Sequence, residues 1–241
     1  MKILHRLLGI LCAFCLMIVL LITSVEAVTY WTPGYYEHEY EKYNVTEAVH
    51  MEMDDLLEVT DQMMAYLRGD REDLHVMTVV NGQPREFFND REIAHMEDVR
   101  GLFLGAIALR RICAAAAVVC VALMFALKAD VKRLLPRMLC VGTGLFFLMV
   151  AAVGLLIASD FSRYFIVFHH IFFNNDLWIL NPATDLLINI VPEPFFADTA
   201  FRIGVTFGLS VLVLFAVCLF FSLRKRRGVS PGENAFTCPS K

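Results

Sequence analysis

Long apolar runs separated by polar segments dominate the pattern of the chain. Four runs each have about the 20 apolar residues that a bilayer core requires, and they lie at residues 7–28, 102–127, 139–158 and 203–223. The 241-residue chain is 58% hydrophobic, which is more than an ordinary soluble domain contains. The pattern predicts an all-α integral membrane protein with four transmembrane helices.

Basic residues gather at one end of these predicted spans. Lys2 and Arg6 precede the first span, four more lie within residues 128–138, and a run follows the fourth span at residues 224–227. Cytoplasmic loops carry an excess of Lys and Arg, so we expect both termini to be cytoplasmic.

The expected organisation divides the chain into eight consecutive segments. We expect transmembrane helices within 1–28, 102–127, 139–158 and 203–223, extracellular segments at 29–101 and 159–202, a basic cytoplasmic loop at 128–138 and a cytoplasmic tail at 224–241.

The first run has an alternative interpretation as a cleaved signal peptide, because Val25-Glu26-Ala27 loosely fits a cleavage site. Its apolar stretch is long for that role, and cleavage would leave an odd number of spans. Cys12 and Cys15 within it form a CxxC pattern that we interpret as apolar packing. The extracellular segments contain no cysteine, so no disulfide framework is available there.

Residues 29–101 are strongly acidic, with 17 Asp and Glu against 6 Lys and Arg. This charge argues against anionic partners, so we expect no nucleic acid to bind. Within the segment, residues 44–69 have the spacing of an amphipathic helix that begins at an Asn44–Glu47 capping box and stops at Gly69.

A small β-hairpin is expected next, because two β-prone runs flank Asn81-Gly82. A second capping-box pattern, Asn89 with Glu92, predicts a helix that begins outside and continues into the second span. Arg110 and Arg111 interrupt the apolar run of that span. Arginine at the bilayer centre costs about 2.5–3.5 kcal/mol, so these two should lie near the outer interface or line a polar cavity.

The segment 159–202 begins with the aromatic sequence DFSRYFIVFHHIFF and continues with a stretch rich in prolines and capping residues. Its Trp178 and many phenylalanines suit the headgroup level of a membrane. We expect an interfacial or re-entrant helix followed by a loop against the outer leaflet.

Candidate chemistry is limited by what the extracellular segments lack. They contain no cysteine, one lysine (Lys42) and few serines, and the chain has no HExxH, GxSxG or P-loop motif. An acyl-enzyme mechanism needs an activated nucleophile, so an outward-facing site would take its nucleophile from the substrate.

Histidine serves as a general acid or base near neutral pH, and His95 and His169 lie in the two segments described above. They could be interfacial amphipathic residues, a catalytic pair or metal ligands. Metal binding fits least, because the neighbours His169 and His170 point about 100° apart on a helix. We therefore expect neither a metal nor a cofactor.

Polar neighbours of the two histidines are candidates for positioning a substrate. On a helix, Arg91 and Asp98 share the face of His95. The loop after His169 supplies Asn175, Asp176, Trp178 and Asp185. Each of these residues could instead be part of a solvated face or a loop cap.

The sequences FFNDREIAHMEDVR and FHHIFFNNDLWILNPATDLLINIVPEPFF together resemble the lipoprotein intramolecular transacylases (Lit) of Gram-positive bacteria. Their H-M-x-D-V pattern is matched from His95 to Val99, and their F-H-x-x-F-F-x-N pattern from Phe168 to Asn175. The likeness covers residues 28–222, including the four-span layout. It implies that His95 and His169 are the catalytic histidines, with His170 on a variable position.

The resemblance implies an acyltransferase whose substrates are diacylglyceryl lipoproteins within membrane lipid. The enzyme moves the sn-2 acyl chain onto the α-amine of the lipidated cysteine, giving a lyso-form lipoprotein that the family links to copper tolerance and weaker immune detection. Reaction within one molecule supplies the effective molarity. We expect a monomer in the plasma membrane with its active site facing the extracellular leaflet.

Two other functions fit the same sequence. A non-enzymatic membrane sensor or transporter accessory protein with an acidic extracellular region would tolerate loss of both His95 and His169. A small transporter fits less well, because no paired broken helices are evident in the spans.

Overall fold

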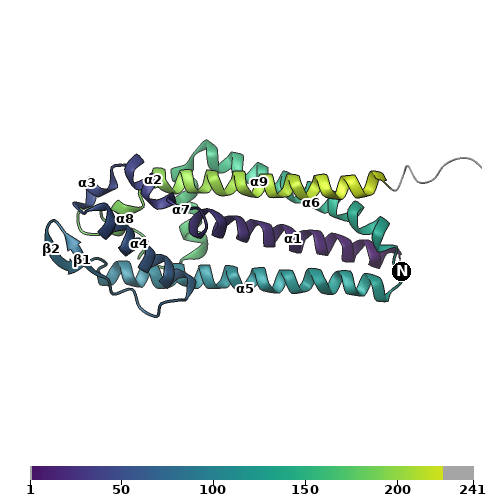
Figure 1. Cartoon of the computed structure of the whole chain (residues 1–241), viewed down its shortest axis with the longest axis horizontal. Coiled ribbons are helices and arrows are strands. Elements are labelled where there is room, and N and C mark those ends of the chain that lie inside the picture. Colours follow the sequence, from purple (N-terminus) through teal and green to yellow (C-terminus); the bar gives the residue numbers. More distant parts are fainter. Residues whose placement is uncertain (1, 225–241) are drawn as a thin grey trace, which may run out of the picture.

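Four long helices form the frame of the computed structural model, which describes residues 2–224. They run side by side in Figure 1 and comprise α1 (Lys2–Tyr30), α5 (Asp90–Ala126), α6 (Val131–Ser159) and α9 (Glu193–Arg224). All four are long and apolar enough to cross a membrane, which confirms the predicted helical membrane architecture. The tail from Lys225 onward, including Cys238, lies outside the described residues.

The helices extend beyond the apolar runs. α5 has 37 residues and is therefore about 55 Å long at 1.5 Å per residue, against a hydrocarbon core of about 30 Å. The helix is therefore longer than the hydrocarbon core is thick. The expected loop 128–138 is mostly helical, because α6 begins at Val131, so the connection to α5 is shorter than predicted.

Helix α1 packs against α5, α6 and α9. Small residues allow the closest approach, since a Cβ added at Gly142 of α6 would lie 2.5 Å from the Cβ of Ala13. Cys12 and Cys15 are free and buried in this bundle, and the Cys12 thiol donates to the Ala117 carbonyl of α5 at 3.8 Å. These contacts agree with the packing interpretation of the CxxC pattern.

An ion pair joins α1 to α5. The guanidinium of Arg110 contacts the carboxylate of Glu26, whose side chain is 9% exposed. A buried charge is tolerated only where it is paired. The partner that sequence could not assign to Arg110 is therefore an acidic residue of the first helix.

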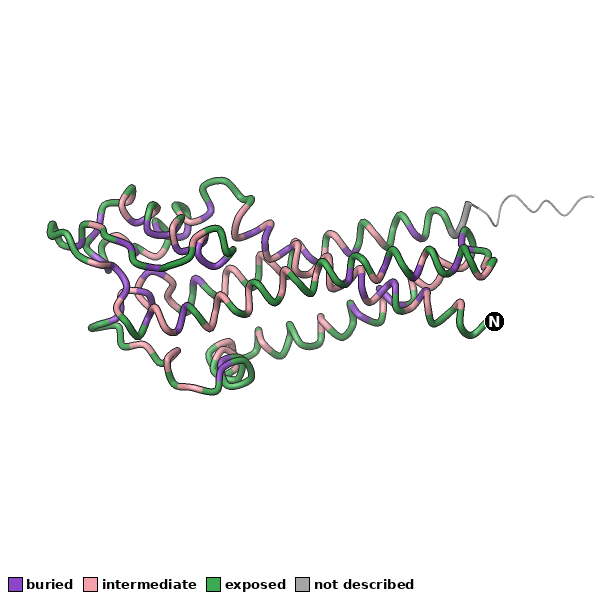
Figure 2. The backbone as a smooth tube through the Cα atoms, turned by 90° about the horizontal axis from the view of Figure 1, so that it is seen from below, coloured by how far each residue is buried: buried purple, intermediate pink, exposed green. Residues whose placement is uncertain are grey.

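The remaining elements gather at one end of the bundle, away from the N-terminus, as Figure 1 shows. We call this part, residues 31–89 and 160–192, the cap. It contains helices α2 (Tyr35–Lys42), α3 (Val45–Val49), α4 (Met53–Arg68), α7 (Phe161–Phe172) and α8 (Leu187–Ile190), with strands β1 (Met77–Val80) and β2 (Gln83–Glu86). Figure 2 shows buried residues within the cap and exposed residues along the outside of the long helices.

The single helix expected over residues 44–69 is broken into α3 and α4. Asn44 has a left-handed backbone (φ 51°) and makes no side-chain cap, so the predicted Asn44–Glu47 capping box is wrong. His50 is also left-handed (φ 53°), and its carbonyl accepts the Asn81 N–H of the hairpin at 2.9 Å. This long-range bond stabilises the break, whereas Gly69 ends α4 as predicted.

The predicted hairpin is confirmed. β1 and β2 pair antiparallel with Val80 opposite Gln83. Asn81 and Gly82 between them both have positive φ, at 55° and 71°, as a two-residue type I′ turn requires. A two-stranded sheet is marginal alone, and the following Phe87 and Phe88 anchor it in the buried core of the cap.

Candidate active site

The N-terminus of α5 is fixed by the predicted capping box. The Asn89 side chain accepts the N–H groups of Arg91 and Glu92, while the Asn89 N–H donates to Glu92 at 2.7 Å. The second Glu92 oxygen accepts the Leu187 N–H at 2.6 Å. Burial raises the pKa of Glu92, and these N–H groups oppose that shift. Glu92 therefore joins the start of α5 to the distant α8.

Helix α7 carries the second histidine and begins at a side-chain cap. The Asp160 carboxylate accepts the Arg163 N–H at 3.1 Å, which satisfies one of the free donors of the first turn. The helix ends where the Phe173 N–H donates to the His169 carbonyl at 2.8 Å. His169 consequently lies in the last turn, with the chain leaving toward α5.

The loop after α7, residues 173–186, is held against α5 by two predicted site residues on each side. Asn175 donates to the Asp98 carboxylate at 2.8 Å, and the Arg91 guanidinium donates to the carbonyl of Asp176. Because Arg91, Asp98 and His95 share one face of α5, these contacts bring the loop and α7 to that face.

The two histidines meet at this junction. The ring centroids of His95 and His169 lie 6.2 Å apart, with an angle of 32° between the planes. Both residues are 7% exposed. Phe173 packs against both rings, with centroid distances of 5.4 Å to His95 and 5.6 Å to His169. The structure thus places side by side two residues that are 74 positions apart in sequence.

The tautomer of His169 follows from its hydrogen bond. Its Nδ1 lies 2.7 Å from the Phe165 carbonyl oxygen. A carbonyl only accepts hydrogen bonds, so the neutral ring carries its proton on Nδ1 and leaves a lone pair on Nε2. Burial lowers the pKa of His169, an effect that the Phe165 carbonyl opposes.

His95 has the opposite arrangement. Its Nδ1 is buried without a hydrogen-bond partner among the described residues, and a buried N–H without an acceptor is rare. The unbonded Nδ1 therefore favours the neutral tautomer that carries its proton on Nε2. The pKa of His95 is lowered to about 4, chiefly by burial and also by the charges of His169 and Arg91, while the charge of Asp98 opposes the shift.

Burial favours the neutral form of both rings, and in that form they are chemically unlike. His169 offers a lone pair at Nε2 and His95 offers an N–H there. Among residues 2–224, no group of three or more His, Cys, Asp or Glu is arranged to hold a metal ion. The pair can accept one proton and donate another to a bound molecule.

Of the two remaining predicted site residues, Trp178 contacts the histidine pair and Asp185 does not. Trp178 stacks on His169 with centroids 4.7 Å apart, whereas Asp185 accepts from the Asn89 side chain at 2.9 Å and the Asn181 N–H at 2.6 Å. Asp185 therefore holds the loop rather than facing the rings. The ring of His170 is nearly perpendicular to the Trp178 indole, with centroids 5.2 Å apart, and His170 is exposed.

Three features of the site were not predicted from sequence. These are the link from Glu92 to α8, the Phe165 carbonyl on His169, and the Trp178–His169 stack. The four-residue spacing from Phe165 to His169 on one helix is the only sequence signal for the second of them. The other two join distant segments.

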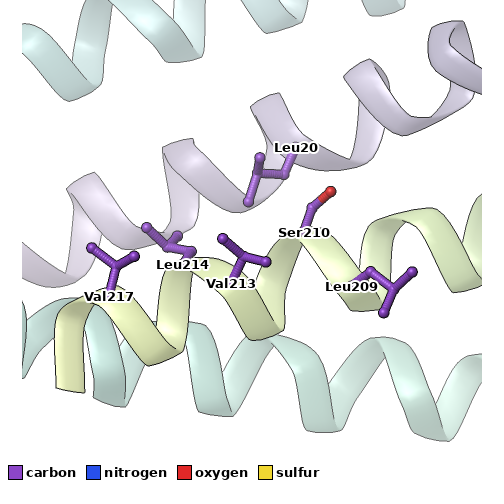
Figure 3. A pocket seen from close by; sticks show the side chains of 6 residues that line it. All are labelled: Leu20, Leu209, Ser210, Val213, Leu214 and Val217. Atoms are coloured by element: carbon purple, nitrogen blue, oxygen red, sulfur yellow. The ribbon is translucent and has the colours of Figure 1, made fainter. Parts of the chain in front are cut away.

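A hollow of the described structure lies away from these residues. It is a groove of about 490 Å³ between α1 and α9, lined by Leu20, Leu209, Ser210, Val213, Leu214 and Val217 (Figure 3). Its lining is apolar and contains no titratable side chain. The candidate chemistry therefore lies at the junction of α5, α7 and the cap loop.

The fold and its helices define a multi-pass integral membrane protein. The sequence profile of the family described as "Lipoprotein intramolecular transacylase Lit" matches residues 10–196, and the chain belongs to this family. A comparison with curated proteins finds no match.

Solved structures show the same fold. The in meso structure of the membrane integral lipoprotein intramolecular transacylase Lit from Bacillus cereus is similar with a TM-score of 0.78 and 20% identity, covering 95% of this chain and 100% of that chain. Two variants of that protein with one histidine replaced are also similar. The arginine variant has a TM-score of 0.73 (20% identity, 92% and 94% covered), and the alanine variant 0.74 (20%, 93% and 96%).

Proposed function

We propose that this chain transfers the sn-2 acyl chain of a diacylglyceryl lipoprotein to the α-amine of its lipidated cysteine, using His169 as the base and His95 as the hydrogen-bond donor to the oxyanion. The observation that carries the proposal is the buried pair of rings, 6.2 Å apart, in which Nδ1 of His169 lies against a carbonyl oxygen and Nδ1 of His95 has no hydrogen-bond partner among the described residues. Membership of the family supports the substrate class.

The first step forms a carbon–nitrogen bond. The neutral α-amine attacks the ester carbonyl carbon, and His169 Nε2 accepts the proton that the amine loses. The Nε2–H of His95 donates a hydrogen bond to the developing oxyanion. A free α-amine has a pKa of about 7.7–8.0, so a base of modest strength is sufficient, and general base catalysis contributes about 10²–10⁴-fold.

The second step breaks the bond between the carbonyl carbon and the sn-2 oxygen. The imidazolium of His169 gives its proton to the departing alkoxide, which becomes a hydroxyl, while the Nε2–H of His95 keeps its hydrogen bond to the carbonyl oxygen. The net change is one acyl transfer and one proton moved from nitrogen to oxygen. No covalent acyl-enzyme forms, because amine and ester belong to one substrate and are held together by it.

The proposed orientation places the cap outside the cell and both termini in the cytoplasm. The cap and the start of α5 are acidic, whereas Lys2, Arg6, Lys132 and Arg133 lie at the other end of the described bundle (Figure 1). The excess of basic residues at that end supports a cytoplasmic location. The histidine pair then faces the extracellular leaflet, where lipoprotein esters lie.

Tandem mass spectrometry tests the proposal. Purified protein is incubated with a synthetic diacylglyceryl lipopeptide, alongside His95→Ala, His169→Ala and the control His170→Ala. We expect a product of unchanged mass whose fragments carry one acyl chain on the cysteine nitrogen, lost in the first two variants and kept in the third. Acyl chains that stay on glycerol with folded wild-type protein would refute the enzymatic function and favour a non-enzymatic membrane protein.

A further inference from the structure

The indole of Trp178 covers one face of the proposed base. The planes of Trp178 and His169 are 29° apart and their centroids 4.7 Å apart, which is a stacked geometry. The indole nitrogen is buried and has no hydrogen-bond partner among residues 2–224. The loop that carries Trp178 is itself fixed to α5 through Asn175 and Asp98.

A catalytic histidine that accepts a proton commonly has a carboxylate beside it, which stabilises the imidazolium. Within the described chain, no carboxylate is hydrogen-bonded or ion-paired with His169. The titratable side chains beside it are His95, with ring centroids 6.2 Å apart, and His170, whose charge lowers the pKa of His169. Asp98, on the facing helix, is engaged by Asn175 and acts on His95.

The face of an aromatic ring is negative, and Trp is the best of the aromatic residues at binding a cation within about 6 Å. We infer that Trp178 is a positioning residue that stabilises the imidazolium form of His169 through its ring face, in the place a carboxylate would take. This inference rests on the proposed function for its catalytic meaning.

Two other roles of Trp178 predict different outcomes. If Trp178 only shields His169 from water, its removal hydrates the ring and raises the pKa of His169 toward the ordinary value of about 6.5. If its N–H binds substrate, replacing it with Phe slows turnover but leaves that pKa unchanged. If Trp178 stabilises the imidazolium, its removal instead lowers the pKa of His169, because the favourable contact with the ring face is lost.

The test is an NMR titration of ¹³C-labelled histidines in the detergent-solubilised full-length protein without substrate, with His169 assigned by His169→Gln. The wild type is compared with Trp178→Phe and Trp178→Leu. The control is Trp31→Leu at the other tryptophan, which is 53% exposed. Because no turnover is measured, the result is independent of whether the chain is a transacylase.

We expect the pKa of His169 to fall in the order Trp, Phe, Leu. The Leu variant should lie about 0.4–1.5 units below wild type, which corresponds to the range of cation–π interactions. Trp31→Leu should cause no change. A rise toward 6.5, or equal values in all variants, would overturn the inference. The Phe variant keeps an aromatic ring over His169, so it still gives a pKa of His169 to compare with wild type if the Leu variant fails to fold.

Discussion

Replacing Glu92 with Gln should release α8 from the start of α5. Glu92 is 1% exposed, and its two oxygens accept the N–H groups of Asn89 and Leu187 at 2.7 and 2.6 Å. Glutamine has one oxygen, so one N–H would face an NH₂ group. Hydrogen bonds to a charged group are worth about 1.5–3 kcal/mol, and we expect a loss of about 2–3 kcal/mol.

Hydrogen exchange measures this loss where it occurs. Local opening at residues 185–190 should become easier by that free energy, which corresponds to about 30- to 160-fold faster exchange. Glu97→Gln is the matched control, because Glu97 lies on the same helix and is exposed. Exchange that is equally slow at residues 185–190 in Glu92→Gln and in wild type would show that the Glu92 contacts do not stabilise the cap.

Three further predictions concern the rings, the ion pair and the turn. The pKa of His95 is about 4 in the folded protein against about 6.5 in the unfolded chain, so the unfolded state binds more protons between these pH values. The free energy of unfolding should therefore fall by about 2 kcal/mol from pH 6.5 to pH 5. Thermal unfolding of the variant His95→Gln should not show that fall. Arg110→Leu alone should cost about 3–5 kcal/mol by leaving Glu26 buried and unpaired, and the double variant with Glu26→Leu should recover most of it in a denaturation cycle; additive losses would contradict the pairing. Gly82→Ala forces a side chain into φ 71° and should lower the melting temperature of the cap through a cost of about 1–2 kcal/mol.

The features that sequence predicts here are those set by neighbouring residues. The apolar runs, the Asn81-Gly82 turn and the Asn89–Glu92 capping box each follow from local patterns, and the structure has all three. The break at His50 does not, because it depends on a hydrogen bond to Asn81, 31 residues away. A left-handed backbone at His50 is unfavourable by local propensity alone.

In the candidate site, too, local sequence patterns were not sufficient where distant segments meet. Sequence reasoning from the residues left His95 and His169 open among interfacial, catalytic and metal-binding roles, and only the family motifs paired them. The roles proposed for them depend on Nδ1 of each ring, which is bonded to the Phe165 carbonyl in His169 and is buried without a partner among the described residues in His95. Such contacts depend on how α7 turns back against α5, and no residue pattern specifies that turn.

The unbroken course of α5 has a consequence for the membrane around it. His95 and Leu102 lie on one continuous helix, so the histidine stands about 10 Å along the axis from the start of the apolar run. A lipid ester keeps to the interface, whose height changes with bilayer thickness, whereas this distance along the helix is fixed. Under the proposed function, hydrophobic mismatch is therefore a variable of catalysis. In that reaction a thicker bilayer would raise the ester past His95, a thinner one would leave it below, and one thickness would align the two.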